Sequence, residues 1–251
     1  HGIIGPVPAE QFSAKSIRAK MRASPLIDGD GPEKLAMTVL TNSTYDGLCY
    51  DAPFVEKALC GLTTNLHFDE AWYAYAHFHE VYAGRYGMHS TEGGDEAPVI
   101  FATQSTHKLL AALSQSSMLH VRDRHVPKDR HVDHDRFNEA FMAHTSTSPQ
   151  YSLIASLDVA ARMMQHGQGR NLMQDAIEEA VTFRRKMSEL RSAVSGPTAD
   201  WWFDIFQPPG IEARSMRHTT APLATPEPEG DDVTSDTSFW LSLGTRPYMR
   251  A

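Results

Sequence analysis

Short apolar runs rich in β-forming residues alternate along the chain with segments of helical periodicity. Four such runs predict strands, at residues 37–41, 66–69, 99–103 and 117–121. Helical patterns predict helices near residues 53–62, 136–144, 151–165 and 172–193. Strands that alternate with helices are typical of an α/β fold, so we expect a largely parallel sheet flanked by helices.

The pattern changes near residue 200. An aromatic run at 201–203 predicts the start of a second packing layer, and prolines, glycines and acidic residues interrupt all periodicity over 208–238. We therefore expect a major domain at residues 1–200 and, at 201–251, a linker or insertion with the start of a further, smaller domain. The opening residues have the pattern of the middle of a strand and a turn, and the last ones carry no stop signal, so we expect a fragment of a longer protein.

Composition and charge restrict the class of protein. Hydrophobic residues make up 41% of the 251 residues and charged residues 22%, as in an ordinary soluble globular protein. The net charge of -8 argues against a nucleic-acid backbone as a partner, and no apolar run approaches the length of a membrane span. The two cysteines, Cys49 and Cys60, make no disulfide framework and no paired metal motif, which favours a reducing compartment such as the cytoplasm.

Polar segments follow three of the expected strands, at residues 41–47, 69–72 and 104–108. In open α/β sheets, ligands bind where strands end and loops begin, at the carboxyl edge. We therefore expect these segments to meet in one site, although their convergence alone does not define its chemistry.

Lys108 is the first candidate for chemistry at this site. It lies among small and apolar residues, where a permanent charge is costly to bury. Burial lowers the pKa of a lysine and frees its amine to attack a carbonyl carbon. The alternative is a solvated lysine at the start of a helix, which is the commoner situation for a single lysine.

Asp69 is the second candidate, because it ends an apolar strand. If the extended backbone continues, Asp69 and Ala71 face the same side, and the small Ala71 leaves room for a flat ring. A buried carboxylate needs a cationic or hydrogen-donating partner, and a protonated pyridine nitrogen is one. The alternative is an aspartate that caps a helix. An aspartate at one strand end and Lys108 at a following one is, however, the arrangement of fold-type I pyridoxal phosphate enzymes.

An extended motif surrounds Lys108. Residues 103–117 contain a serine two positions before the His-Lys pair and, downstream, a Ser-Gln followed by small residues. This segment resembles the cofactor-attachment signature of the bacterial ornithine/lysine/arginine decarboxylases. Segments 40–47, 67–72 and 144–149 resemble further parts of that family, in the same order, and the resemblance extends from about residue 2 to residue 190.

The resemblance implies that pyridoxal 5'-phosphate is the cofactor and gives roles to matching residues. Lys108 would carry the cofactor covalently. Asp69 would hold the pyridine nitrogen protonated, so that the ring accepts electrons. Ala71 would pack beneath the ring, and Trp72 would lie near it.

Three further residues have roles that the family implies. Ser105 and His107 would bind the cofactor phosphate, and assistance in proton transfer is an alternative role for His107. Ser146 resembles a hydroxyl position that reaches the phosphate of the neighbouring subunit. The resemblance therefore implies a homodimer with shared sites, and larger assemblies of dimers are usual in the family.

The function that the resemblance implies is decarboxylation of a basic amino acid, lysine, arginine or ornithine, to the corresponding amine and carbon dioxide. The family's phosphate-cradling loop and its ring-stacking histidine would precede residue 1, and its carboxyl-terminal domain would follow residue 251. We therefore expect the fragment alone to bind cofactor poorly or to be inactive.

Three alternatives remain open at this point. An aminotransferase would use the same Asp69 and Lys108, and a catalytically inactive paralogue with a regulatory or binding role would keep the fold. A metal site is the third, built from His77 and His79 or from a group at residues 125, 131 and 134. Neither group has a recognisable ligand pattern, so we predict no metal.

Overall fold

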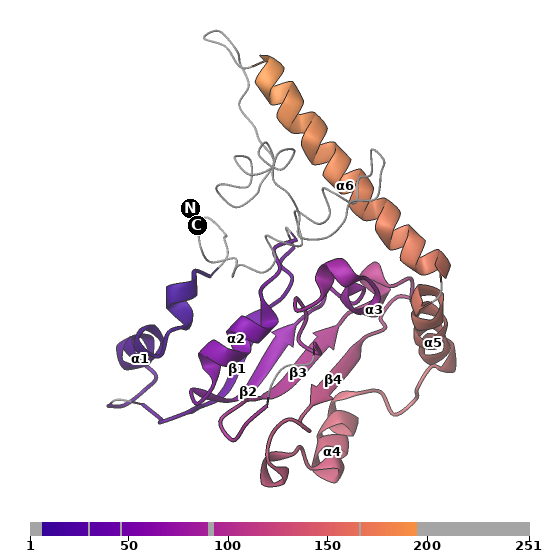
Figure 1. Cartoon of the computed structure of the whole chain (residues 1–251). Coiled ribbons are helices and arrows are strands. Elements are labelled where there is room, and N and C mark those ends of the chain that lie inside the picture. The colour runs from indigo at the N-terminus through magenta and orange to yellow at the C-terminus, as the bar shows by residue number, and fades with distance from the viewer. Residues whose placement is uncertain (1–6, 30, 46, 90–92, 166, 195–251) are drawn as a thin grey trace.

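The computed structural model describes residues 7–29, 31–45, 47–89, 93–165 and 167–194 (Figure 1). Its strands are β1 (Leu35–Thr41), β2 (Thr63–Asp69), β3 (Val99–Gln104) and β4 (Met118–Arg122). Its helices are α1 (Ala14–Ala23), α2 (Ala52–Leu59), α3 (Thr106–Leu109), α4 (His134–His144), α5 (Tyr151–Gln165) and α6 (Gly167–Val194). Short 3-10 helices at Ala9–Phe12, Ala76–Phe78, Glu80–Tyr82 and Lys128–Arg130 lie in the connections. The expectations for residues 1–5 and for the second unit at 201–251 lie outside the described residues.

Local sequence signals fix where several helices begin. The Asp51 side chain accepts a hydrogen bond from the Phe54 N–H at 3.0 Å and starts α2. Asp133 caps α4 in the same way through the Arg136 N–H, at 2.9 Å. The four helices of the sequence analysis are confirmed, whereas the sequence pattern predicts neither α1 nor the short α3.

A four-stranded sheet forms the centre of the described chain, in the order β1-β2-β3-β4. β1, β2 and β3 are parallel, and β4 runs antiparallel to β3. The crossover from β1 to β2 contains α2, as a parallel pair requires. The expectation of a largely parallel sheet flanked by helices is confirmed.

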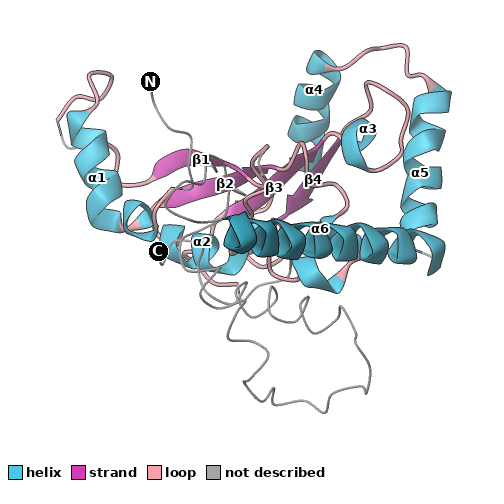
Figure 2. Ribbon diagram, turned by 90° about the horizontal axis from the view of Figure 1, so that it is seen from above, coloured by secondary structure: helices cyan, strands magenta, loops and turns pink. Residues whose placement is uncertain are grey.

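One face of the sheet, called the covered face below, carries the hydrophobic core. Leu66 and Phe68 of β2 and Ile100 and Ala102 of β3 are each 0% exposed, and they pack with residues of α2 such as Val55. Figure 2 shows α2 on this side of the strands. Because strand side chains alternate, the intervening residues face the opposite side.

The opposite side, called the open face below, is much less buried. Met37 and Val39 of β1 are 47% and 60% exposed, and Leu119 of β4 is 40% exposed. His67 and Asp69 share this face by alternation along β2. The site residues on β2 therefore lie on a side of the sheet that the described residues leave accessible.

Helices α5 and α6 also expose apolar side chains. Ile154 and Val159 of α5 are 52% and 54% exposed, and Leu172 and Phe183 of α6 are 67% and 59% exposed.

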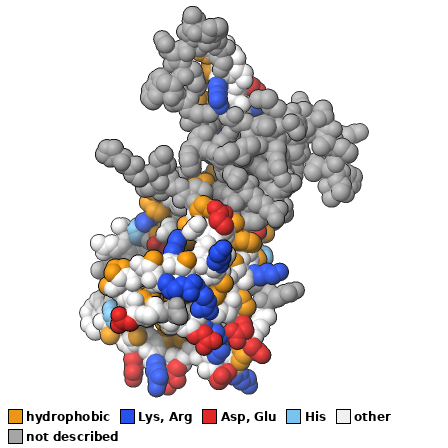
Figure 3. Space-filling model, turned by 90° about the vertical axis from the view of Figure 1, so that its left-hand side faces the viewer, with side chains coloured by type: hydrophobic (Ala, Val, Ile, Leu, Met, Phe, Trp, Pro, Cys, Tyr) orange, Lys and Arg blue, Asp and Glu red, His pale blue; other side chains and the backbone are white. Residues whose placement is uncertain are grey.

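Acidic and basic side chains are interspersed on the molecular face that Figure 3 displays. Within the described residues, no helix has both the length and the apolar character needed to cross a membrane.

Candidate active site

The carboxyl ends of β1, β2 and β3 lie side by side. In the sheet register, Thr41 pairs with Asp69, and Asp69 pairs with Thr103. Two hydrogen bonds extend the pairing past the strand ends, from the Asn42 N–H to the Asp69 carbonyl (2.7 Å) and from the Glu70 N–H to the Thr103 carbonyl (2.8 Å). The expected meeting of the three polar segments at one edge is confirmed.

Lys108 reaches over Trp72 at this edge. Its Nζ lies 4.6 Å from the centre of the indole ring. The Tyr45 ring approaches the same indole nearly at right angles, with centroids 5.2 Å apart. Such a cation–aromatic contact stabilises an exposed amine by on the order of 0.5–1 kcal/mol. Because these three residues follow three different strands, the loops of all three strands converge around Trp72.

Lys108 is exposed, which corrects the expectation of a desolvated amine. Thr106 and Leu110 are 0% and 1% exposed and anchor the helical turn, whereas Leu109 is 45% exposed. The apolar character of the segment therefore reflects its anchoring residues and not the surroundings of the amine. Locally, Lys108 fits the alternative of a solvated lysine in a helical turn, and its amine is accessible to the carbonyl group of a ligand.

Asp69 is partly buried at the end of β2. Its Oδ1 accepts a hydrogen bond from the Ala71 N–H at 3.2 Å, and Ala71 and Trp72 form a turn. The extended backbone thus ends before Ala71, so the condition under which Ala71 would face the same side as Asp69 is not met. The helix-cap alternative was wrong, because the next helical turn begins only at Ala76.

His67 and Thr103 lie beside Asp69 on the open face. His67 Nε2 and Thr103 Oγ1 are 2.6 Å apart. Burial lowers the pKa of His67, and the nearby Asp69 carboxylate opposes this shift. When His67 is neutral, no imidazolium charge lies beside the Asp69 carboxylate. That carboxylate can therefore hold the proton of a ligand cation.

Ser105 and His107 lie at the start of α3, next to Lys108. His107 Nδ1 donates a hydrogen bond to the Ser116 carbonyl at 2.7 Å, which leaves Nε2 available to a ligand. The Ser105 hydroxyl makes no capping hydrogen bond to α3. Thr106 Oγ1 and Ser116 Oγ are 3.0 Å apart and help to fix the segment. This set of a hydroxyl, an imidazole and an amine fits a phosphate-bearing aldehyde.

Ser146 lies in the connection between α4 and α5. It is exposed, and its hydroxyl accepts a hydrogen bond from the Ser148 N–H of the same loop at 3.1 Å. Its described polar contacts therefore stay within that loop. A role towards a neighbouring subunit stays a prediction.

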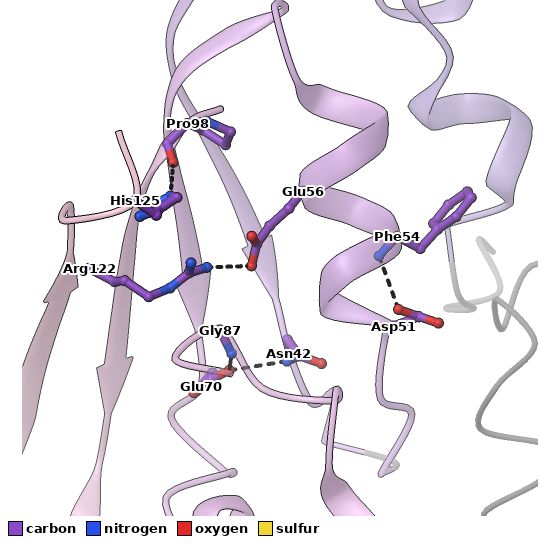
Figure 4. Close-up of polar contacts among 9 residues, drawn as sticks. All are labelled: Asn42, Asp51, Phe54, Glu56, Glu70, Gly87, Pro98, Arg122 and His125. Carbon is purple, nitrogen blue, oxygen red and sulfur yellow. Dashed lines mark hydrogen bonds and ion pairs between the residues drawn. The ribbon is translucent and has the colours of Figure 1, made fainter. Parts of the chain in front are cut away.

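Sequence reasoning missed Glu70, which follows Asp69 directly. Glu70 is 0% exposed, and its carboxylate accepts hydrogen bonds from the Asn42 side chain and the Gly87 N–H (Figure 4). Burial raises its pKa to about 7, against the effect of its hydrogen-bond donors. The available signal was alternation, because Glu70 continues the core-facing series of Leu66 and Phe68.

The histidines considered as metal ligands have separate hydrogen-bond partners. His77 lies 3.1 Å from the Tyr86 hydroxyl, and His79 lies 2.9 Å from the Gln174 side chain. His125 contacts the carbonyl of Pro98. Over the described ranges, no group of three or more His, Cys, Asp or Glu side chains is arranged to hold a metal ion.

Comparison with known proteins adds independent information. A profile of the family described as Orn/Lys/Arg decarboxylase, major domain, matches residues 1–239. The lysine decarboxylase LdcA of Pseudomonas aeruginosa is 54% identical over 211 residues, which is 84% of this chain and 27% of that protein. The biodegradative arginine decarboxylase of Escherichia coli is 43% identical over 205 residues, 81% of this chain and 26% of that protein.

A solved structure agrees with these sequence matches. Lysine decarboxylase A from Pseudomonas aeruginosa superposes with a TM-score of 0.67 at 53% identity, covering 80% of this chain and 26% of that one. The chain thus spans about a quarter of the length of the relatives that it matches. It belongs to the Orn/Lys/Arg decarboxylase family.

Proposed function

We propose that the protein of which this chain forms part is a pyridoxal 5'-phosphate-dependent decarboxylase of a basic amino acid, namely lysine, arginine or ornithine. The observation that carries the proposal is the convergence of Asp69, Trp72 and Lys108 at one edge of the sheet. Relatives that are named lysine and arginine decarboxylases support the substrate class.

Four residues would hold the cofactor by complementary chemistry. The Lys108 amine would hold its aldehyde carbon covalently, and the Asp69 carboxylate would hold the proton on its pyridine nitrogen. The Trp72 indole, which is in contact with Lys108, would lie near the ring. The Ser105 hydroxyl donates to a phosphate oxygen.

His107 has two uses in this site that depend on its protonation. With Nδ1 donating to the Ser116 carbonyl, a neutral ring presents Nε2 as an acceptor and can take up a proton there. Only the doubly protonated ring can donate from Nε2 to a phosphate oxygen. In either role, His107 would act beside Ser105 and Lys108.

When bound, pyridoxal phosphate supplies the conjugated ring that accepts the electron pair released as the bond from Cα to the carboxylate breaks. The protein orients that bond and maintains the charge of the ring through Asp69. One proton is added at Cα for each carbon dioxide released, so the products are one amine and one carbon dioxide. Ala71 adds little bulk beside Asp69 and leaves space for a planar group.

The proposal extends to a homodimer, and to larger assemblies of such dimers, in which Ser146 of one subunit serves the phosphate of the next. Its support is the exposed position of Ser146 and the exposed apolar residues on α5 and α6. Sedimentation of the complete protein measures this assembly.

Cys49 and Cys60 are both free, and we extend the proposal to a cytoplasmic location on that basis.

The test uses the complete protein with added pyridoxal phosphate and, separately, lysine, arginine and ornithine. We expect one of the three to release carbon dioxide and the matching amine in equal amounts. Formation of a keto acid without carbon dioxide would show an aminotransferase instead. No turnover of any of the three, together with no cofactor absorbance, would identify an inactive paralogue.

A further inference from the structure

A buried chain of hydrogen bonds runs across the covered face, beneath the site. Glu70 Oε1 accepts from Asn42 Nδ2 (3.2 Å) and from the Gly87 N–H (2.6 Å), as Figure 4 shows. Glu70 Oε2 accepts from Gln104 Nε2 (3.0 Å), and Gln104 Oε1 lies 3.2 Å from His120 Nε2. Asn42 and Glu70 follow β1 and β2, Gln104 ends β3, and His120 lies in β4. This chain of hydrogen bonds therefore links all four strands.

The identity of the donors and acceptors fixes the direction of each hydrogen bond in this chain of hydrogen bonds. The three partners of Glu70 among the described residues are N–H donors, which suits a carboxylate that only accepts. Because Gln104 uses its amide nitrogen on Glu70, its amide oxygen faces His120 and requires the His120 proton on Nε2. Replacement of Glu70 therefore disturbs the partners on both neighbouring strands.

The central members of the chain stand next to residues of the proposed site. Glu70 directly follows Asp69, and Gln104 directly precedes Ser105. Asn42, Glu70 and Gln104 are 0%, 0% and 7% exposed, so water cannot replace a lost partner without rearrangement. A change in their hydrogen bonds must move the strand ends that carry the site.

We propose that Glu70 is a positioning residue for the decarboxylation site: its carboxylate fixes the strand ends that hold Asp69, Trp72 and Lys108 in register. Glu70 faces away from the open face and touches no ligand in this role. The inference rests on the proposed function, since the positioned residues are those of the proposed cofactor site.

An exchange of the two central groups tests the inference directly. In the double variant E70Q/Q104E, the amide introduced at position 70 donates to the carboxylate introduced at position 104, which also accepts from His120 Nε2. The amide oxygen at position 70 still accepts from Asn42 and Gly87, so every described hydrogen bond of the chain is restored. In Gln104→Glu alone, two carboxylates face each other, and they cannot both ionise without a large cost.

The complete protein should respond to these variants in a graded way. Glu70→Ala should lower kcat by about 10- to 100-fold, because small misplacements of reacting groups cost this much, while KM for the amino acid changes little. Gln104→Glu should lose activity increasingly as pH rises, and E70Q/Q104E should recover most of it. A double variant no better than Gln104→Glu overturns the inference, and so does a folded Glu70→Ala with unchanged kcat.

Two further readouts do not depend on turnover. In the cofactor-free protein, Glu70→Ala should increase hydrogen exchange at residues 69–72 and 104–110, and its dissociation constant for pyridoxal phosphate should rise. Glu56→Gln is the matched control, because Glu56 is also a buried carboxylate on the covered face but pairs with Arg122, away from this edge (Figure 4). It should leave both readouts unchanged, and equal effects of Glu56→Gln and Glu70→Ala would overturn the inference.

The unsubstituted protein separates the two proposals. If it releases no carbon dioxide from any basic amino acid, the proposed function fails and the positioning role fails with it. If it does release carbon dioxide but the Glu70 and Gln104 variants behave like it, only the positioning role is overturned.

Discussion

Asp69 and Glu70 are consecutive carboxylates at the end of β2, yet they lie in opposite environments. Asp69 is partly buried on the open face and accepts one hydrogen bond from the nearby Ala71 N–H. Glu70 is 0% exposed on the covered face and accepts three, from Asn42, Gly87 and Gln104. The difference follows from the alternation of side chains along a strand. It leaves Asp69 with capacity for a ligand, while described protein donors occupy both oxygens of Glu70.

The two faces of the sheet therefore have different roles at this edge. The open face presents chemical groups, with Lys108 over Trp72 and Asp69 beside the accessible side of β2. The covered face supplies rigidity through the core around Phe68 and through Glu70. Substitutions on the open face should affect turnover more than stability. Substitutions on the covered face should affect stability, and they should affect turnover only where they displace residues of the proposed site.

Lys108→Ala should give the largest effect and is the hardest test of the open face. Loss of a covalent nucleophile should lower kcat of the complete protein by at least about 1,000-fold and leave the fold intact, because Lys108 is exposed. Borohydride reduction followed by mass spectrometry should find a pyridoxyl adduct on the unsubstituted protein and none on the variant. An adduct that persists in the variant would refute the assignment, and Lys57→Ala, which removes an exposed lysine of α2, is the control.

Asp69→Ala should be next in size. Without the carboxylate, the proton on the pyridine nitrogen is no longer held, and kcat should fall by about 100- to 1,000-fold while some cofactor remains bound. Steady-state kinetics and cofactor absorbance measure the two quantities separately. Retained turnover would exclude the electrostatic role of Asp69, and Asp158→Asn, at an exposed ion pair with Arg162, serves as the control.

Much of the fold could be predicted because its signals are local. Apolar runs located β1 to β4, and the 3.6-residue period located α5 and most of α6. The direction of β4 could not be predicted, because the chain between β3 and β4 is long enough for either pairing. The short α3 has too few residues to show a period.

The meeting of the polar segments was predicted correctly, whereas the surroundings of Lys108 were predicted wrongly. The meeting of three strand ends followed from parallel topology, and the Lys108 motif identified the family. The expected burial of Lys108 was wrong because composition does not show which of Thr106, Lys108 and Leu110 turns inward. Glu70 was missed because a carboxylate at a core-facing position is explained only by its distant partners Asn42 and Gln104.

Glu56→Ala tests whether the covered face acts through stability alone. Glu56 Oε1 lies 2.7 Å from Arg122 Nη2, with side-chain exposures of 7% and 16%. Removal of one member of a buried pair should lower the free energy of unfolding by about 3 kcal/mol, with kcat unchanged at temperatures where the variant is folded. Urea unfolding and steady-state kinetics check this. The exposed pair of Lys34 and Glu96 gives the contrast, because Glu96→Gln should change neither quantity measurably.

The smallest expected effect is a change in the pH dependence of stability at Glu70. Burial raises the pKa of Glu70 from its ordinary 4.5 to about 7 in the folded protein, and the charge of Asp69 adds to the shift. Below about pH 4.5, both the folded and the unfolded states are protonated there, and this contribution to stability is fully present. As pH rises towards 7, the unfolded state gains the favourable charge first, so the contribution is lost, by about 3 kcal/mol at most.

Glu70→Gln removes this ionisation while preserving the volume of the side chain. The difference in melting temperature between the variant and the unsubstituted protein should therefore move in favour of the variant as pH rises from 5 to 8. Titrating groups outside the hydrogen-bond chain of Glu70 cancel in the comparison. His120 belongs to that chain, and because burial lowers its pKa, its own contribution has a pH dependence of opposite sign. A difference that is constant with pH would mean that Glu70 does not change its charge in the folded protein, and the covered face would then hold an ionised carboxylate throughout.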